Sequence, residues 1–487
     1  MSDVIIHKKN EVYVKLECEP HILYELQEYF TFEVPGAKFM PQMRSKYWDG
    51  KIRLLSVATG EIYIGLLSKV VDKLKVHGYT YEFRENKFYG LPYEINEEIS
   101  FEGVKDYMNF ICSHSPRQYQ VEGVYDALRH NRKLLISPTA SGKSLMIYSI
   151  VRYYVDKGKK ILLVVPTTSL VEQMYKDFLD YGWDADAYCH RIYSGREKIN
   201  TMPVTITTWQ SVYKLERKFF EDYDVVMGDE AHLFKSKSLV GIMTKLHKTK
   251  YRFGFTGTLD GSQTHKWILE GLFGPSYKVT QTAELMEKGH LSKLDIRCLV
   301  LKHPPQKFET FEDETQFIIT HDKRNNLIKN LVLDLKGNTL ILFSRIDAHG
   351  RPLYELINNN TSEKRKVFFV HGGVNTIERE KVREITEREN NAIIVASYGV
   401  FSTGINIKNL HNVIFASPSK SRVRNLQSIG RVLRKGSNKT KAMLYDIADD
   451  CTYNSRKNYT LNHFIERIKI YNEERFNYEI ITINLKR

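Results

Sequence analysis

Short apolar runs alternate with longer helical segments from about residue 115 onward, and this rhythm sets the expected fold. Continuous apolar strands separated by helices are typical of parallel sheets with crossover helices. We therefore expect two α/β domains in tandem, divided near residues 285–300. The first set of strands is expected at Leu134–Ile136, Ile161–Val165, Val204–Thr207, Val225–Met227 and Arg252–Phe255. The second is expected at Thr339–Phe343, Lys366–Val370, Ala392–Ala396, Val413–Ala416 and Ala442–Tyr445.

The two ends of the chain have a different pattern. Before residue 100, strand-like runs (Val12–Leu16, Ile52–Leu55) mix with helical ones (Ile22–Phe30, Leu67–Val76), which indicates a small α+β domain. An acidic stretch, Tyr93–Asp106, follows it. The tail reads as an amphipathic helix over Leu461–Tyr478 that packs on the second α/β domain. The expected domains are 1–100, 101–288, 289–450 and a C-terminal extension, 451–487.

Charge narrows the choice of partner. The 487 residues carry 72 Lys and Arg against 58 Asp and Glu, a net charge of +14, and most of the excess follows residue 287. Such an excess favours nucleic acid or an anionic membrane surface, although a cationic soluble surface is an equal alternative. No apolar run reaches the ~18 residues of a membrane span, and no signal pattern opens the chain. Five scattered cysteines suit a reducing compartment, so we expect a cytoplasmic protein.

One segment between a strand and a helix has the composition of a phosphate-binding loop. Backbone N–H groups of such a loop and the helix that follows bind anionic oxygens. Here Lys143 supplies charge for the β- and γ-phosphates and Ser144 a hydroxyl for Mg²⁺. Ser137 stands where the usual pattern has Gly, and the alternative is a polar turn with a solvated lysine. The expected ATP-binding loop comprises Pro138, Thr139, Ala140, Ser141, Gly142, Lys143 and Ser144.

Two adjacent carboxylates end a later apolar strand. Asp229 is expected to reach Mg²⁺, while Glu230 orients or deprotonates the water that attacks the γ-phosphate. An acidic loop beside a solvated histidine is the alternative, and it weakens because the same domain carries the phosphate loop. Far along the chain, Arg431 and Arg434 are spaced to lie on one face of a helix. A guanidinium that reaches the transferred phosphoryl group stabilises its charge, whereas in isolation these arginines would indicate an ordinary basic helix.

Together these motifs resemble superfamily 2 helicases of the DEAH-box type. Asp229-Glu230-Ala231-His232 matches the box itself, and Gln427–Arg434 is similar to the arginine motif of the second domain. The resemblance implies two RecA-like motor domains, ATP and Mg²⁺ as cofactors, and an active site shared between the domains. It also implies that Arg117 and Gln120 read the adenine, that His232 belongs to the ATP site, and that Thr256-Gly-Thr258 couples hydrolysis to movement. The Asn406 position departs from the Asp found in many relatives.

The same resemblance implies which residues contact the tracked strand. They lie in Pro166–Leu170 and Thr207–Ser211 of the first motor domain and in Phe343–Arg345 and Ser397–Asn406 of the second. In the N-terminal domain, Arg44 and Lys46 precede Trp48, and Lys51 and Arg53 follow it. Trp48 is either a stacking platform for an unpaired base or a core residue beside a solvated hairpin. The expected nucleic-acid contacts are Pro166, Thr167, Thr208, Trp209, Gln210, Ser344, Arg345, Ser397, Thr403, Lys51 and Arg53.

The N-terminal run Tyr47–Leu55 and the later run Val395–Gly404 complete this pattern. With them, the layout of the whole chain is similar to the UvsW family of T-even phage recombination and repair helicases. That likeness implies a 3′-to-5′ helicase that regresses forks, migrates Holliday junctions and dissolves RNA–DNA hybrids. Its partners would be branched, duplex and single-stranded DNA, RNA–DNA hybrid and single-strand-binding or recombination proteins, with the chain monomeric and in the host cytoplasm. A duplex translocase and an ATP-gated annealing factor remain alternatives. A nuclease is disfavoured because we find no second cluster of metal-binding carboxylates in the sequence.

Overall fold

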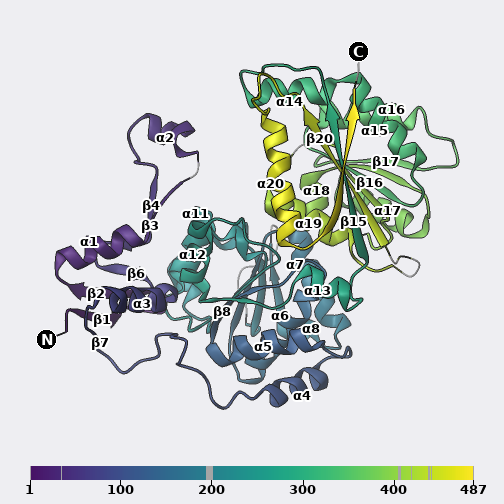
Figure 1. Ribbon diagram of the computed structural model, residues 1–487. Helices are drawn as coiled ribbons and strands as arrows, with labels where there is room; N and C mark the ends of the chain where they lie inside the picture. Colours follow the sequence, from purple (N-terminus) through teal and green to yellow (C-terminus); the bar gives the residue numbers. More distant parts are fainter. Residues whose placement is uncertain are drawn as a thin grey trace. The chain divides into compact units, whose positions relative to one another are not determined.

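The structure is a computed structural model that describes residues 2–34, 36–193, 201–403, 407–417, 419–436, 439 and 441–485 (Figure 1). The side chains of Phe39, Arg44, Thr376, Ser402 and Thr403 are outside the description. The chain forms two compact units. One consists of Met1–Ser137 with Gly142–Val279, and the other of Pro138–Ser141 with Thr280–Arg487.

The N-terminal part of the first unit is a mixed sheet with two helices, as the pattern predicts. Along β2 the apolar residues Val14 and Leu16 are buried while Lys15 and Glu17 are exposed, so one face of the sheet carries a core. The strand order is β5-β6-β2-β1-β7. The elements are β1 (Val4–Lys8), β2 (Tyr13–Cys18), α1 (Pro20–Tyr29), β5 (Leu55–Ser56), β6 (Glu61–Tyr63), α3 (Leu67–His77) and β7 (Tyr81–Phe83).

A two-stranded arm extends away from this sheet (Figure 1). It consists of the antiparallel strands β3 (Thr31–Glu33) and β4 (Lys51–Arg53), with the short helix α2 (Pro41–Arg44) between them. The side chain of Tyr47, close to α2, is 90% exposed.

The N-terminal sheet shares its core with the rest of the first unit. Trp267 of α12 (Gln263–Phe273) packs among the rings of Tyr29, Phe30 and Phe32, with centroids 5.1–5.4 Å apart. Gly65 lies so close to α12 that a Cβ there would be 2.1 Å from the carbonyl oxygen of Glu270. Because such packing leaves no room for sliding, the N-terminal domain and α12 form one body.

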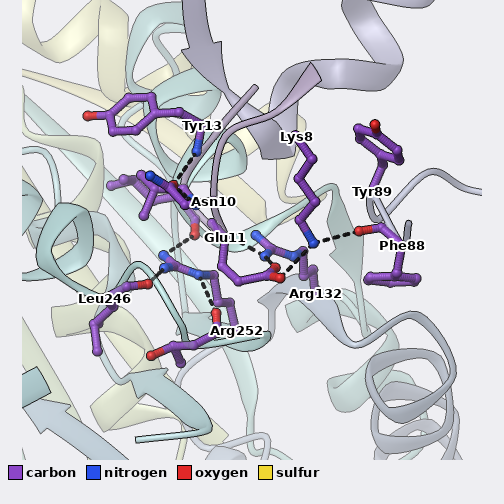
Figure 2. A network of polar contacts seen from close by, with 12 residues as sticks. Lys8, Asn10, Glu11, Tyr13, Phe88, Tyr89, Arg132, Leu246 and Arg252 are labelled. Atoms are coloured by element: carbon purple, nitrogen blue, oxygen red, sulfur yellow. Dashed lines mark hydrogen bonds and ion pairs between the residues drawn. The ribbon is translucent and has the colours of Figure 1, made fainter. Parts of the chain in front are cut away.

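A buried ionic network reinforces this junction (Figure 2). Glu11 accepts a hydrogen bond of 2.6 Å from the Lys8 ammonium and is also paired with the Arg132 guanidinium. Lys8 donates a second bond of 2.7 Å to the carbonyl of Phe88. Arg132 belongs to β8 (Arg132–Ile136), so Glu11 connects the N-terminal domain to the sheet that carries the phosphate loop.

Seven parallel strands in the order β10-β11-β9-β12-β13-β8-β14 form the sheet of the first motor domain. Strands β9, β11 and β12 are buried at every position, which explains the unbroken apolar run of β9, while β11 also buries three threonines. The strands are β8, β9 (Ile161–Val165), β10 (Cys189–Ile192), β11 (Val204–Thr208), β12 (Val225–Gly228), β13 (Tyr251–Thr256) and β14 (Ser276–Lys278). The helices are α4 (Phe101–Ile111), α5 (Gln118–His130), α6 (Lys143–Asp156), α7 (Thr168–Asp180), α8 (Ala185–Tyr188), α9 (Trp209–Val212), α10 (Arg217–Phe220), α11 (Lys237–Lys245) and α12.

The second unit is built on another parallel sheet, in the order β17-β18-β16-β19-β20-β15-β21. Its strands are β15 (Lys293–Lys302), β16 (Thr339–Phe343), β17 (Val367–Val370), β18 (Ile393–Ser397), β19 (Asn412–Phe415), β20 (Lys441–Asp450) and β21 (Asn477–Asn484). Its helices are α13 (Thr282–Glu287), α14 (Phe311–Thr320), α15 (Asp322–Asp334), α16 (Arg351–Asn358), α17 (Thr376–Arg388), α18 (Tyr398–Thr403), α19 (Arg422–Val432) and α20 (Tyr459–Glu473). With two such sheets, the predicted fold class is confirmed.

The C-terminal tail differs from its prediction in one respect. Helix α20 ends at Glu473, and the residues after it form β21, which pairs with β15 instead of prolonging the helix. The helix is fixed to β20 because Arg467 donates to the Asp446 carboxylate at 2.8 Å and the Tyr471 hydroxyl donates to the same group at 2.8 Å. The extension therefore contributes a strand to the second sheet.

Candidate active site and nucleic-acid surface

The predicted phosphate loop connects β8 to the first residue of α6, as the motif requires. Gly142 has φ +81°, and a Cβ at that position would lie 2.3 Å from Nε2 of Gln120. A side chain is therefore excluded both by the backbone conformation and by the neighbouring amide. Helix α6 begins at Lys143. The N–H groups at the start of a helix have no partners within the helix, so those that follow the loop are available to bind an anion.

The two predicted carboxylates follow β12 and contact the lysine of the loop. Lys143 Nζ lies 3.1 Å from Glu230 Oε1 and 3.4 Å from Asp229 Oδ1. Glu230 has a left-handed backbone, with φ +49°, and its N–H donates to Asp229 Oδ1 at 2.8 Å. A non-glycine residue held in this conformation is typical of functional sites. The structure thus brings together the three side chains expected to act on the γ-phosphate.

Burial and charge act in opposite directions on these groups. Burial alone lowers the pKa of the Lys143 ammonium, but attraction to Asp229 and Glu230 outweighs it and raises that pKa. Burial and the neighbouring Glu230 raise the pKa of Asp229. Burial also tends to raise the pKa of Glu230, yet Lys143 and His232 hold it well below its ordinary value. Glu230 is therefore a carboxylate at neutral pH.

His232 connects the carboxylates to the next strand. Its Nδ1 lies 3.3 Å from Glu230 Oε2 and 3.1 Å from the Thr256 hydroxyl. Thr256 ends β13, and its hydroxyl donates to the carbonyl of Thr258 at 3.0 Å. The sequence elements expected to hydrolyse ATP and to transmit its effect are thus in direct contact.

The residues expected to read the adenine lie at the start of α5. Gln120 is buried, accepts from the backbone N–H of Arg117 at 2.8 Å, and directs its amide nitrogen to the carbonyl of Gly142 at 3.5 Å. The Arg117 guanidinium donates to the Tyr119 hydroxyl at 2.9 Å. Gln120 therefore joins the adenine-reading element to the phosphate loop.

Sequence reasoning missed one residue of this site. The Tyr181 hydroxyl lies 2.7 Å from Ser144 Oγ, the predicted magnesium ligand. Burial raises the pKa of Tyr181 to about 12, so the phenol is protonated at neutral pH. No local motif marks a tyrosine that follows α7 by one residue, because its contact with Ser144 exists only in the folded chain.

The oxygen donors of this site suit a magnesium ion that is held jointly by the protein and the phosphates of the nucleotide. Within the described ranges, no group of three or more His, Cys, Asp and Glu side chains is arranged to hold a metal. Mg²⁺ is commonly bound by one or two protein oxygens together with the substrate's phosphates and water. The Ser144 hydroxyl and the Asp229 carboxylate are hard oxygen donors of that kind and would be its protein ligands.

The two arginines of the second unit lie at the end of α19. Arg431 is within the helix, with its guanidinium 5.8 Å from the centroid of the Phe401 ring. Arg434 comes two residues after the last helical residue, so the prediction that both arginines lie on one helical face is wrong. At the end of the helix, the Lys439 ammonium donates to the carbonyl of Val432 and, at 3.2 Å, to that of Arg434.

The expected nucleic-acid contacts of the first motor domain gather at one edge of its sheet. Strands β9 and β11 are parallel neighbours, with Val165 opposite Thr208. The segments after them meet where Gln210 Nε2 approaches the carbonyl of Pro166 at 3.5 Å. Three of the predicted contact residues are not fully free for a ligand. The Thr167 side chain caps α7, and the buried Thr208 hydroxyl is hydrogen-bonded to that of Ser211 at 2.9 Å. Trp209 is half-buried.

A similar edge exists in the second sheet. Phe343 of β16 is opposite Ser397 of β18, so exposed Ser344 and half-buried Arg345 follow one strand while Ser397 ends its neighbour. Arg345 is paired with Glu312 at 2.5 Å. The side chain of Thr403 and the whole of Asn406 lie outside the described residues.

The remaining predicted contacts belong to the arm of the N-terminal domain. Lys51 and Arg53 are exposed on β4, and Arg53 is paired with Asp49 at 2.5 Å. The Trp48 indole N–H donates to the carbonyl of Lys51 at 2.8 Å, and its ring is half-buried. Trp48 is therefore fixed to the first residue of β4, at the end of the strand nearer α2, and it is outside the hydrophobic core of the N-terminal domain.

Three family models match successive parts of the chain. Residues 3–84 match the family described as "DNA helicase UvsW, N-terminal", residues 113–261 "Type III restriction enzyme, res subunit", and residues 322–436 "Helicase conserved C-terminal domain". The ATP-dependent DNA helicase uvsW of Enterobacteria phage T4 is 35% identical over 514 aligned residues, covering 99% of this chain and all of the relative. The chain belongs to the UvsW family of superfamily 2 helicases.

Structural comparison agrees with membership of the UvsW family. The crystal structure of T4 UvsW has a TM-score of 0.52 with this chain at 32% identity, covering 99% of this chain and all of that one. A DNA 3′-5′ translocase of Sulfurisphaera tokodaii is 22% identical over 79% of this chain and 93% of its own length. As a UvsW-family member, the protein is an ATP-hydrolysing helicase that acts on DNA. Its described residues contain no helix that is both long and apolar enough to cross a membrane.

Proposed function

We propose that the protein hydrolyses MgATP to unwind and branch-migrate branched DNA, namely forks and Holliday junctions, and to dissolve RNA–DNA hybrids. It would do so in recombination, repair and replication restart, with 3′-to-5′ polarity and as a monomer in the cytoplasm of a phage-infected host. Single-strand-binding and recombination proteins would act beside it. The observation that carries the proposal is the UvsW-type N-terminal domain at residues 3–84, because motor domains alone are common to helicases of many substrates.

In this proposal the loop 138–142 and the first turn of α6 bind the phosphates, and Lys143 provides their positive charge. Ser144 and Asp229 would hold Mg²⁺, which neutralises charge on the β- and γ-phosphates when it is bound. Arg117 and Gln120 would face the adenine, and His232 would connect the site to Thr256.

The chain's own residues must rearrange for hydrolysis. Lys143 is paired with Glu230 at 3.1 Å, and the γ-phosphate of arriving ATP competes for the same ammonium. Once the ammonium turns to the phosphate, the Glu230 carboxylate is free to orient the attacking water and accept its proton. Arg431 and Arg434 would then stabilise the charge that spreads over the transferred phosphoryl group. Because these arginines belong to the second unit, hydrolysis would require the motor domains to come together.

Movement along DNA would use the edges of both sheets. Pro166, Thr167, Thr208, Trp209 and Gln210 would hold the tracked strand on the first sheet, and Ser344, Arg345, Ser397 and Thr403 on the second. Lys51 and Arg53 of the arm would contact the branched part of the substrate.

The decisive experiment is a strand-displacement assay with ATP on matched substrates: a fork, a four-way junction, an R-loop and a blunt linear duplex. We expect dissociation of the three branched substrates and little of the linear one, with Lys143→Ala as the control that removes all products. Equal separation of every substrate, or none of the branched ones, would contradict the proposal.

Duplex translocation without strand separation is a second candidate, because the Sulfurisphaera tokodaii relative is described as a translocase. Displacement of a third strand from a linear triplex, without separation of the duplex beneath it, would identify that activity. The two candidates differ in the product, so the same ATP-containing reactions distinguish them.

A further inference from the structure

A pocket of about 350 Å³ lies at the end of the second sheet that also carries Ser344 and Ser397. Its walls come from the segment after β15 and the segment after β20, and these strands are parallel, with Lys302 opposite Asp450. The pocket is at the lower end of the size range for small-ligand sites, which fits one nucleotide and not a duplex. The residues that matter are Lys307, Phe308, Tyr453, Arg456, Lys457 and Tyr459.

The pocket carries three basic side chains that form no ion pair within the described residues. Lys307, Arg456 and Lys457 are exposed, and within the described residues no carboxylate oxygen lies within ion-pairing distance of their nitrogens. The acidic residue of the lining, Glu314, is fully buried and already used: it accepts from the Asn458 amide and from the backbone N–H of Thr460, both at 2.7 Å. Among the described residues the three cations therefore have no acidic partner, and they are available to a phosphate.

Aromatic rings line the same pocket, and two of them, Tyr459 and Phe308, have contacts that hold them in place. The Tyr459 hydroxyl donates to the carbonyl of Glu309 at 3.2 Å, and Phe308 packs on Phe317 with centroids 5.4 Å apart. Tyr453, 41% exposed, stands at the start of a tight turn in which it exchanges backbone hydrogen bonds of 3.1 and 2.9 Å with Arg456. An exposed ring beside a cation on one rigid turn is the arrangement that stacks an unpaired base while binding its phosphate.

A chain of side-chain contacts connects the pocket to a predicted nucleic-acid contact. Arg345 is paired with Glu312 in the first turn of α14. The residue before Glu312, Phe311, lies 6.3 Å, centroid to centroid, from the ring of Tyr459. A strand held at Arg345 therefore needs to pass only the start of α14 to reach the pocket.

We propose that this pocket binds an unpaired nucleotide of the DNA strand that the second motor domain holds, with the base on Tyr453 and its phosphates against Lys307, Arg456 and Lys457. The inference rests on the proposed function, since it extends the path of the same strand. It assigns the segments 306–308 and 453–459 a binding role beyond the helicase motifs.

The test measures the affinity of the full-length protein for a fluorescein-labelled oligo(dT), without ATP, across a range of salt concentrations. The pocket variant is Arg456→Ser with Lys457→Ser. The matched control is Lys336→Ser with Lys364→Ser, which removes the same charge from exposed positions before β16 and β17, at the opposite end of the parallel strands. Tyr453→Leu and Tyr453→Phe test stacking separately.

We expect the pocket variant to lower the slope of log affinity against log salt by about 0.7 for each phosphate that the variant no longer binds, and the control to leave the slope unchanged. Tyr453→Leu should weaken binding at least about fivefold, the lower end of the effect of removing one stacked base, while Tyr453→Phe binds like wild type. ATP hydrolysis without DNA should be unchanged in all four variants, which verifies that each is folded.

Each failure has a separate reading. If wild-type protein does not bind oligo(dT) in a salt-dependent way, the proposed function itself is wrong. If wild type binds but the pocket and control variants are weakened equally, the cations act only through net charge and the pocket proposal is overturned. Wild-type affinity in both the pocket variant and Tyr453→Leu would also overturn it.

Discussion

The Lys143 ammonium lies 3.1 Å from Oε1 of Glu230, which joins the phosphate loop to the residue expected to activate water. Both groups are charged, because each holds the other in its ionised form. The contact implies that nucleotide binding must separate the pair before the carboxylate can act.

Replacing Lys143 with Ala should abolish most ATP hydrolysis, by at least about 100-fold, since loss of one preorganised charge donor commonly costs that much. DNA affinity should change little, because the expected DNA contacts lie at the ends of other strands. Steady-state hydrolysis with and without DNA, and a DNA-binding titration on the same preparation, measure both effects. A wild-type hydrolysis rate would show that the phosphate site lies elsewhere.

Replacing Glu230 with Gln should slow turnover by about 10²–10⁴, because the amide keeps the size of the side chain but cannot accept a proton. ATP should still bind, since Lys143 and the loop are intact, and the complex with DNA should persist. A filter-binding measurement of retained ATP, compared with Lys143→Ala, separates the two variants. Rapid turnover by Glu230→Gln would transfer the base role to another group.

Replacing Glu11 with Gln should lower the free energy of unfolding by about 3 kcal/mol, because it leaves the buried Arg132 and Lys8 cations without their carboxylate. The control is Glu17→Gln, whose ion pair with His7 is exposed and should contribute less than about 1 kcal/mol. Urea denaturation measures both. Equal stability of the two variants would mean that the network in Figure 2 does not hold the N-terminal domain to the motor.

The same network predicts a pH dependence. Burial tends to raise the pKa of Glu11, but Arg132 and Lys8 outweigh it and lower the pKa below the ordinary value of 4.5. A carboxylate with a depressed folded-state pKa stabilises the protein fully above its unfolded pKa, and this stabilisation is lost as pH falls through the folded value. The stability difference between wild type and Glu11→Gln should therefore be constant near neutrality and shrink below about pH 4.5. A difference that grows with acidity would contradict this assignment.

Most of the motor could be predicted from sequence because its signals are local. Apolar runs such as Ile161–Val165 are buried on both faces. The phosphate loop and the paired carboxylates each directly follow an apolar run in the sequence, so both motifs can be recognised locally. Strand β21 was missed because most of its residues are exposed and its partner, β15, lies about 180 residues earlier. Tyr181 was missed because its partner, Ser144, is distant in sequence. The end of α19 was missed because the bonds beyond it come from Lys439, which follows the arginine motif. The run from Tyr453 to Tyr459 did carry a signal, since its two tyrosines enclose Arg456 and Lys457.

We propose that the two motor domains share one ATP site, and hydrolysis by Arg431→Ala in the presence of DNA tests this proposal most directly. Arginines that stabilise a transferred phosphoryl group are worth about 10³–10⁵ in rate, so we predict a severe loss of DNA-stimulated turnover with ATP affinity changed much less. Arg434→Lys should be similarly impaired, because an ammonium keeps the charge but not the planar fork. Thermal unfolding of the same samples checks that the variants are folded. DNA-stimulated hydrolysis at the wild-type rate in Arg431→Ala and Arg434→Ala would contradict the shared site, and with it the coupling of hydrolysis to movement.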